Sequence, residues 1–252
     1  MTFDSKLTKL LRAKPTPILF LDFDGTVSTR DAIDLMLERF ADEKWVAVEE
    51  RWKNGAIGSR ECLSEQVALI RASRVEIDGL LDEITLDNGF YELLKLARRH
   101  KIKTHIISDG FDYCIERILS RIKVHHRPSF FSSHLEFQDG KWQTDFPHFS
   151  DLCEHGCATC KPLLMKNLNP QGLQTIFVGD GLSDRYAARA ADLVFAKNGL
   201  AKYCSAQQVD FLPYGDLYDV SHTLSELIDE KPLNAERVVP FSVSVFSEEL
   251  FT

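Results

Sequence analysis

The feature that most constrains this chain is an apolar run that ends in two carboxylates. Residues 17–21 read Pro-Ile-Leu-Phe-Leu and lead into Asp22, Phe23, Asp24 and Gly25. A continuous apolar run of this kind predicts a strand buried on both faces of a parallel sheet. Buried carboxylates are costly, so we expect both acids at the carboxyl end of that strand, where open α/β sheets bind ligands. Alternate residues share a strand face, so both acids would point into one crevice, and Gly25 would allow a sharp turn after them.

Two later segments repeat this pattern. Residues 103–108 form a β-rich run that ends in Ser108, and residues 174–179 lead into Asp180, with Asp184 close behind. Each polar residue has a commonplace explanation when it stands alone, such as a helix cap or a turn. Lys161 lies between the two segments and is the candidate for a buried cation. Taken together, the residues predict a site for a hard cation and a nucleophile.

In this order, the segments resemble the motifs of the haloacid dehalogenase superfamily of phosphatases, over roughly residues 17–205. The resemblance implies an α/β fold with a Rossmann-like parallel sheet and an inserted helical cap. It also implies Mg²⁺ dependence and an aspartyl-phosphate intermediate. We expect a core domain at residues 1–26 and 86–230, a cap at residues 27–85 and a C-terminal tail at residues 231–252.

The resemblance also implies a role for each motif residue. Asp22 would be the nucleophile, and Asp24 the general acid and then the base. The expected Mg²⁺ ligands are Asp22, the Asp24 backbone carbonyl and Asp180. Asp184 would orient a metal-bound water or the lysine. The groups expected to bind phosphate are Ser108, Asp109, Gly110 and Lys161.

Periodicity predicts the remaining elements. In the expected cap, helices are predicted at 31–40, 44–53 and 60–72, with Ser59 as the N-cap of the last. In the core, helices are predicted at 90–100, 111–122, 162–168 and 184–191, and a short strand at 193–196. Residues 134–145 alternate around Asp139-Gly140, which predicts a hairpin. The stretch from Val238 is predicted as an edge strand or an extended tail.

The layout looks like the phosphoserine phosphatase branch, but the expected substrate-binding residues differ. Gln66 stands where that branch has its carboxylate-binding arginine, and Asp31 stands where it has a glutamate. A glutamine binds a carboxylate poorly, so phosphoserine is not the expected substrate. The cysteine-rich stretch before the motif lysine is instead similar to methionine-salvage phosphatases, which act on a keto-enol phosphate. It is also similar to the phosphocholine and phosphoethanolamine phosphatases. Trp45 and Trp52 could line a pocket for a cationic amine, with packing in the cap core as the simpler explanation.

The alternatives to a phosphatase are a phosphotransferase, a dehalogenase and a scaffold without activity. The motifs do not separate a phosphatase from a phosphotransferase, which uses the same chemistry. Dehalogenases usually lack the second acid, which is Asp24 here, and a scaffold would be expected to have lost a motif acid.

Composition narrows the possible partners and the compartment. The formal net charge of −8 and the pI near 5.5 argue against nucleic acid or an anionic membrane as the main partner. No apolar stretch approaches ~18 residues, and the N-terminus lacks a secretory pattern, so we expect a cytoplasmic protein with reduced thiols. The expected partner is a small phosphomonoester, with a monomer and a homodimer both open. Cys153, Cys157 and Cys160 could hold a structural zinc, but packed thiols or a disulfide are the simpler account.

Overall fold

The computed structural model describes residues 16–121 and 127–228. The start of the expected core domain, the expected tail at 231–252 and the stretch from Val238 lie outside the described residues.

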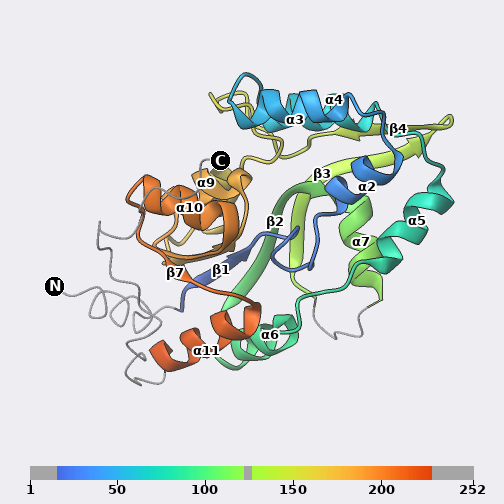
Figure 1. Cartoon of the computed structure of the whole chain (residues 1–252). Helices are drawn as coiled ribbons and strands as arrows, with labels where there is room; N and C mark the ends of the chain where they lie inside the picture. Colours follow the sequence, from blue (N-terminus) through green and yellow to red (C-terminus); the bar gives the residue numbers. More distant parts are fainter. Residues whose placement is uncertain (1–15, 122–126, 229–252) are drawn as a thin grey trace, which may run out of the picture.

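A mostly parallel sheet forms the centre of the molecule (Figure 1). Its strand order in the described residues is β4-β3-β2-β1-β5-β6-β7, and of these strand pairs only β3–β4 is antiparallel. The strands are β1 (Ile18–Leu21), β2 (Lys103–Phe111), β3 (Ser129–Gln138), β4 (Lys141–Asp145), β5 (Thr175–Gly179), β6 (Leu193–Ala196) and β7 (Leu212–Pro213). The predicted α/β class with a parallel sheet is therefore confirmed.

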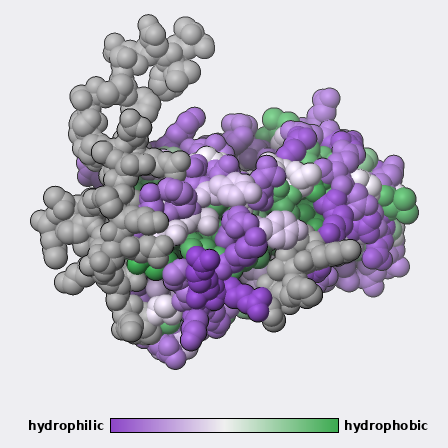
Figure 2. Space-filling model, turned by 90° about the horizontal axis from the view of Figure 1, so that it is seen from below, coloured by the Kyte–Doolittle hydropathy of each residue, from purple (hydrophilic) through white to green (hydrophobic). Residues whose placement is uncertain are grey.

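Alternate side chains of β1 enter two separate apolar layers, as expected for a strand buried on both faces. Leu19 and Leu21 pack with α6 (Phe90–Arg99), α7 (Asp112–Ser120) and α11 (Leu217–Ile228). Ile18 and Phe20 pack with α8 (Lys161–Leu168), α9 (Arg185–Ala190) and α10 (Asn198–Ala206). In the view of Figure 2, hydrophilic side chains cover most of the visible described surface, which fits burial of the apolar residues inside these layers.

Four helices are inserted between β1 and α6. They are α2 (Ala32–Phe40), α3 (Trp45–Lys53), α4 (Ser59–Val67) and α5 (Arg74–Glu83). Met36 of α2 and Ile77 of α5 belong to the same apolar core as the sheet. The α3–α4 pair lies along β4, the strand at one edge of the sheet (Figure 1). The insertion is therefore only partly separate from the core, and the borders 27 and 85 stay a prediction.

The predicted helix at 60–72 is wrong in its extent, because α4 ends at Val67 and a further helix, α5, follows. Ser73 starts α5 with a capping box: its hydroxyl accepts from Glu76 N, and the Glu76 carboxylate accepts from Ser73 N. The pattern Ser-x-x-Glu in the sequence was the signal for this start. The N-cap of α4 is Gly58 and not Ser59 as predicted, since Ser59 lies inside the helix.

The second strand is also longer than predicted. It runs to Phe111, with a shift of register between Ile107 and Phe111, so α7 starts one residue later than expected. The helix predicted from residue 184 is preceded by a short 3₁₀ turn at Leu182–Asp184. The predicted hairpin is present, and both residues of its Asp139-Gly140 turn have positive φ, as a two-residue hairpin turn requires. Within the described residues no helix is long and apolar enough to cross a bilayer.

Candidate active site

The motif acids meet at the carboxyl edge of the sheet. Asp22 follows β1 and Asp180 follows β5, and these strands are neighbours, with Leu21 paired to Val178. Asp22 N donates to the Val178 carbonyl, which extends the pairing up to the first acid. The order of the strands therefore brings together acids that are far apart in the sequence.

Lys161 is buried between two of these acids. Its Nζ lies 2.7 Å from Asp22 Oδ1 and 2.5 Å from Asp184 Oδ1, and only 2% of its side chain is exposed. Burial alone would lower the pKa of Lys161, but Asp184 and Asp22 raise it well above its usual value. Asp184 is held in turn by N–H groups of Asp180 and Gly181, which donate to its other oxygen. Lys161 is therefore a buried cation held in a fixed position beside Asp22.

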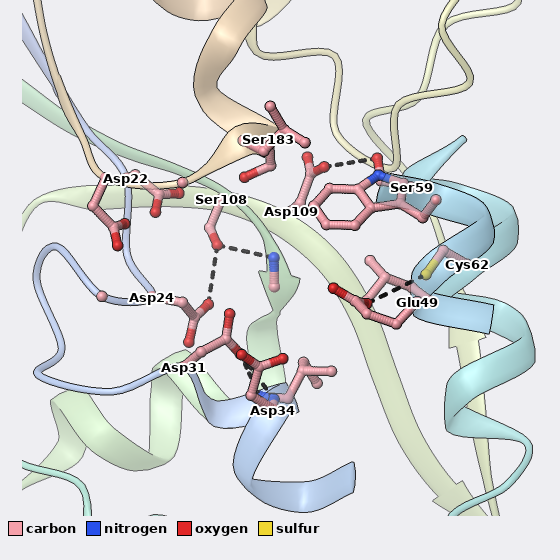
Figure 3. A pocket seen from close by; sticks show the side chains of 18 of the residues that line it. Asp22, Asp24, Asp31, Asp34, Glu49, Ser59, Cys62, Ser108, Asp109 and Ser183 are labelled. Atoms are coloured by element: carbon pink, nitrogen blue, oxygen red, sulfur yellow. Dashed lines mark hydrogen bonds between the residues drawn. The ribbon is translucent and has the colours of Figure 1, made fainter. Parts of the chain in front are cut away.

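Asp24 occupies a separate position beside the second strand. Its Oδ1 accepts from Ala32 N at 3.0 Å and its Oδ2 from Ser108 Oγ at 3.4 Å, while Ser108 Oγ accepts from Gly110 N (Figure 3). Burial raises the pKa of Asp24 to about 6. A carboxyl group with such a pKa can both give and take a proton near neutral pH.

Three carboxylates form the group best suited to a metal ion. One oxygen each from Asp22, Asp180 and Asp184 lies within 4.8 Å of the others. Burial raises the pKa of Asp22 well above its usual value and that of Asp180 to about 6, and the charge of Asp184 adds to both shifts. Asp22 and Asp184 are buried and Asp180 is half-buried, and the single buried lysine bonded to this set does not balance three negative charges, so the oxygen-rich set fits a hard divalent cation such as Mg²⁺. The side chain of Asp24 lies outside this set, while its backbone carbonyl stays a predicted ligand.

Thr26 and Asn198 contact the carboxylate of Asp180, and neither residue was singled out from the sequence. Thr26 Oγ1 donates to Asp180 Oδ1 at 3.2 Å, and Asn198 Nδ2 lies 3.4 Å from Asp180 Oδ2. Thr26 ends the run that begins at Pro17, so its place in the first motif was the available signal. Nothing comparable in the sequence marks Asn198.

A cavity of about 540 Å³ joins the motif residues to the inserted helices. All three substrate-binding candidates of the sequence, Asp31, Trp52 and Gln66, line it. Asp31 Oδ1 also caps α2 by accepting from Ile33 N and Asp34 N. Trp45, the other tryptophan considered for a pocket, packs against the apolar core instead.

The far end of the cavity holds an acid that the sequence did not single out. Glu49 Oε2 accepts from Gln66 Nε2 at 2.9 Å, and the Cys62 thiol lies 3.9 Å from the same oxygen (Figure 3). The side-chain N–H of Gln66 therefore bonds to a neighbouring side chain and does not point freely into the cavity. Glu49 and Trp52 lie one turn apart on α3, and Cys62 and Gln66 one turn apart on α4. This spacing was the signal that these residues face the same space.

Asp109, predicted among the phosphate-binding groups, directs its carboxylate toward protein partners. Its Oδ2 accepts from Ser59 Oγ at 2.8 Å and its Oδ1 from Thr159 N at 3.1 Å. An ionised carboxylate has no hydrogen to donate to a phosphate oxygen. Any phosphate contact of this residue is therefore expected from its backbone N–H alone.

The cysteine-rich stretch lies beside this site. Burial opposes ionisation of Cys153, but the backbone N–H groups of Cys157 and His155, and after them the thiols of Cys157 and Cys160, donate to its sulfur and lower its pKa. All three are free thiols. Among residues 16–121 and 127–228, the metal-ligand atoms found close together in a group of three are those of the carboxylates and not these sulfurs.

Comparison with known proteins agrees with this geometry. The model of the haloacid dehalogenase-like hydrolase family matches residues 19–189. The chain is 29% identical over 204 residues to a 2-hydroxy-3-keto-5-methylthiopentenyl-1-phosphate phosphatase of an Exiguobacterium species, covering 79% of this chain and 93% of that protein. It is also 29% identical over 208 residues to the protein of the same name from Bacillus velezensis, covering 81% and 88%.

Solved structures show the same fold. A phospho-aspartyl intermediate analogue of phosphoserine phosphatase superposes with a TM-score of 0.64 at 19% identity, covering 82% of this chain and 98% of that one. The motif resemblance is thus confirmed by the family match, the similar phosphatases and the shared fold. This chain belongs to the haloacid dehalogenase-like hydrolase family and is a phosphatase of that family.

Proposed function

We propose that this phosphatase hydrolyses a small phosphorylated metabolite in a Mg²⁺-dependent reaction that passes through an aspartyl-phosphate at Asp22. The observation that carries the proposal is the pair of ion pairs that Lys161 makes with Asp22 and Asp184. Asp180, the third acid of the carboxylate cluster, lies next to them. The bridge fixes one Asp22 oxygen on the lysine, which leaves the other as the attacking atom. Such an arrangement suits a carboxylate that must approach a phosphate dianion.

The steps follow from the positions of the side chains. The free oxygen of Asp22 attacks phosphorus, the bond to the leaving oxygen breaks, and Asp24 gives that oxygen its proton. Asp24 then takes a proton from water as the water attacks the phosphoaspartate, which releases phosphate and restores Asp22. Ser108 Oγ and Lys161 Nζ donate to the phosphoryl oxygens. A Mg²⁺ ion held by the three clustered carboxylates and the Asp24 carbonyl would neutralise charge on the phosphoryl group.

For the substrate, we propose a keto-enol phosphate of the methionine-salvage type. The support is the name of the similar bacterial phosphatases, together with the apolar part of the cavity wall around Ile33, Leu63 and Trp52. An uncharged, sulfur-containing tail would bury apolar surface there. The free thiols support a location in the reducing cytoplasm.

A second candidate class is a phosphorylated cationic amine, such as phosphocholine or phosphoethanolamine. The observation that favours it is the charge of the same cavity, since Asp34 and Glu49 line it together with the indole of Trp52. Carboxylates and an aromatic face attract an ammonium group. Lys53 lies 3.6 Å from Glu49 and offsets part of this charge.

Phosphate release from a panel of phosphomonoesters, with and without Mg²⁺, tests both candidates. The panel holds a keto-enol phosphate analogue, phosphocholine, phosphoethanolamine, phosphoserine and sugar phosphates, and Asp22→Asn is the control. A kcat/KM above about 10⁴ M⁻¹s⁻¹ for one compound identifies its class. Turnover that survives Asp22→Asn contradicts the nucleophile assignment. Transfer of phosphate to an added alcohol in preference to water would show a phosphotransferase.

A further inference from the structure

The start of α4 rests on the segment at residues 156–160. Arg60 N donates to the Gly156 carbonyl at 3.0 Å. A Cβ atom on Gly58 would lie only 2.4 Å from that carbonyl oxygen, so the two main chains touch. A side chain at position 58 would separate them. The absence of a side chain at Gly58 therefore allows the inserted helix pair to approach this segment closely.

The Asp109 carboxylate joins this contact to the second strand. It accepts from Ser59 Oγ on α4 and from Thr159 N on the 156–160 segment. Ser59 Oγ accepts in turn from Ala158 N at 3.0 Å. Figure 3 shows the bond between Asp109 and Ser59 at the wall of the cavity. Each group in the set thus has a partner on a different segment.

These hydrogen bonds join β2, α4 and the segment at residues 156–160. Two of these segments hold or adjoin motif residues, and α4 forms part of the cavity wall. Ser108 and Gly110 flank Asp109 in β2, and Lys161 follows Thr159 by two residues. On the other side, α4 carries Gln66, which holds Glu49 of α3. A shift of the start of α4 would therefore move the whole wall formed by the helix pair.

We propose that Asp109 and Ser59 form a latch that holds the α3–α4 pair closed over the catalytic carboxylates. Asp109 is then a positioning residue, which sets the distance between the cavity wall and the phosphate end without contacting phosphate through its carboxylate. This inference rests on the proposed function for its kinetic part, but the latch itself is a property of the free protein. It predicts that only substrates long enough to touch the helix pair depend on it.

The test uses the full chain with Mg²⁺ and the variants Ser59→Ala, Ser59→Thr and Asp109→Asn. Ser64→Ala is the matched control, because Ser64 lies on the same helix but does not line the cavity. Hydrogen–deuterium exchange over residues 45–67 measures opening of the helix pair. We expect exchange in Ser59→Ala to rise about tenfold, as for the loss of one hydrogen bond to a charged group, with Ser59→Thr and Ser64→Ala near the wild type.

Kinetics with a longer and a shorter substrate distinguish an effect on the helix pair from an effect on the phosphate site. For p-nitrophenyl phosphate, whose ring we expect to extend from the phosphate site toward the helix pair, we expect Ser59→Ala to lower kcat/KM about tenfold, mainly through KM. For acetyl phosphate, which carries only a methyl group beyond its carbonyl and so has little to contact on the helix pair, we expect a change within about twofold. Asp109→Asn combined with Ser59→Ala should cost less than the sum of the two single changes, because both remove the hydrogen bond between Ser59 and Asp109.

The outcomes are distinct. Unchanged exchange in Ser59→Ala and in Asp109→Asn overturns the latch. An equal loss of kcat for both substrates also overturns it, since the residues would then act on the phosphate end. A wild-type protein that hydrolyses neither substrate contradicts the proposed function, and the exchange experiment still decides the latch.

Discussion

Replacement of Gly110 by alanine is expected to displace the general acid while the fold survives. A Cβ atom at this position would lie 2.3 Å from Asp24 Oδ2 and 3.1 Å from Ser108 Oγ. Real Cβ contacts essentially never fall under 3.0 Å, so the carboxylate must move by at least the difference, 0.7 Å. Asp24 Oδ1 is tied to Ala32 N, so the carboxylate has to rotate about that bond and leave Ser108.

The size of the effect follows from this displacement. A misplacement of ~1 Å in a catalytic group costs about 10²-fold in rate. Overpacking costs about 1–3 kcal/mol, which for a protein of this size lowers the Tm by roughly 2–12 °C. Because a typical free energy of unfolding is about 5–15 kcal/mol, we expect Gly110→Ala to stay folded at 25 °C and to lose about 99% of its kcat.

The assay compares two leaving groups. The p-nitrophenolate ion leaves without a proton, whereas phenolate needs one, so loss of the acid should harm phenyl phosphate more. We expect kcat for phenyl phosphate to fall about tenfold further than kcat for p-nitrophenyl phosphate. Gly79→Ala in α5 is the matched control, because nothing lies within 4 Å of its added Cβ, and we expect it to gain about 0.5–1 kcal/mol. A wild-type kcat in folded Gly110→Ala, or an equal loss for both leaving groups, would refute the assignment of Asp24 as the acid.

Further predictions concern stability. Lys161→Met leaves two buried carboxylates unpaired, so we expect a loss of about 3–5 kcal/mol in a denaturant titration without Mg²⁺, and a smaller loss would mean that water reaches the site. Mg²⁺ at a hundred times its Kd should stabilise the wild type by about 2.7 kcal/mol but Asp180→Asn by much less; an equal Tm rise in both would contradict the metal site. Ser73→Ala removes the capping box of α5 and should cost about 1 kcal/mol by the same titration, and no change would show that the box is dispensable. Burial lowers the pKa of His105 from 6.5 to about 4, so the unfolded chain takes up this proton first as the pH falls from 6.5 to 4. The free energy of unfolding should therefore fall over that window by up to about 3 kcal/mol more than in His105→Phe, and parallel pH profiles would contradict this.

The motif acids could be found from the sequence because each follows a recognisable buried strand. Asp22 and Asp180 close apolar runs, and parallel strands place their carboxyl ends at one edge of the sheet. The hairpin was equally readable, since Asp139-Gly140 is a strong local turn signal. Features that depend on a few neighbouring residues were therefore predictable.

The cavity wall was predicted only in part. Asp31, Trp52 and Gln66 do line the cavity, but the partner of Gln66 is Glu49, a residue on another helix. The mistaken role of Ser59 has the same cause. Ser59 is the first residue of α4 and so resembles an N-cap in the sequence, yet its hydroxyl donates to Asp109, fifty residues away in the sequence. A polar side chain on a helix has several partners within reach, and only the packing of the helices selects one.

The sequence by itself determined the parallel sheet, the acids at its carboxyl edge and the family, because these depend on local hydrophobic patterns and on short motifs. The tertiary structure decided which groups the acids and the inserted helices contact. It paired Lys161 with both Asp22 and Asp184, and it turned Asp109 toward α4. The physical reason is that hydrogen bonds and charge pairs act over a few ångströms, so their partners are fixed only when distant segments pack together.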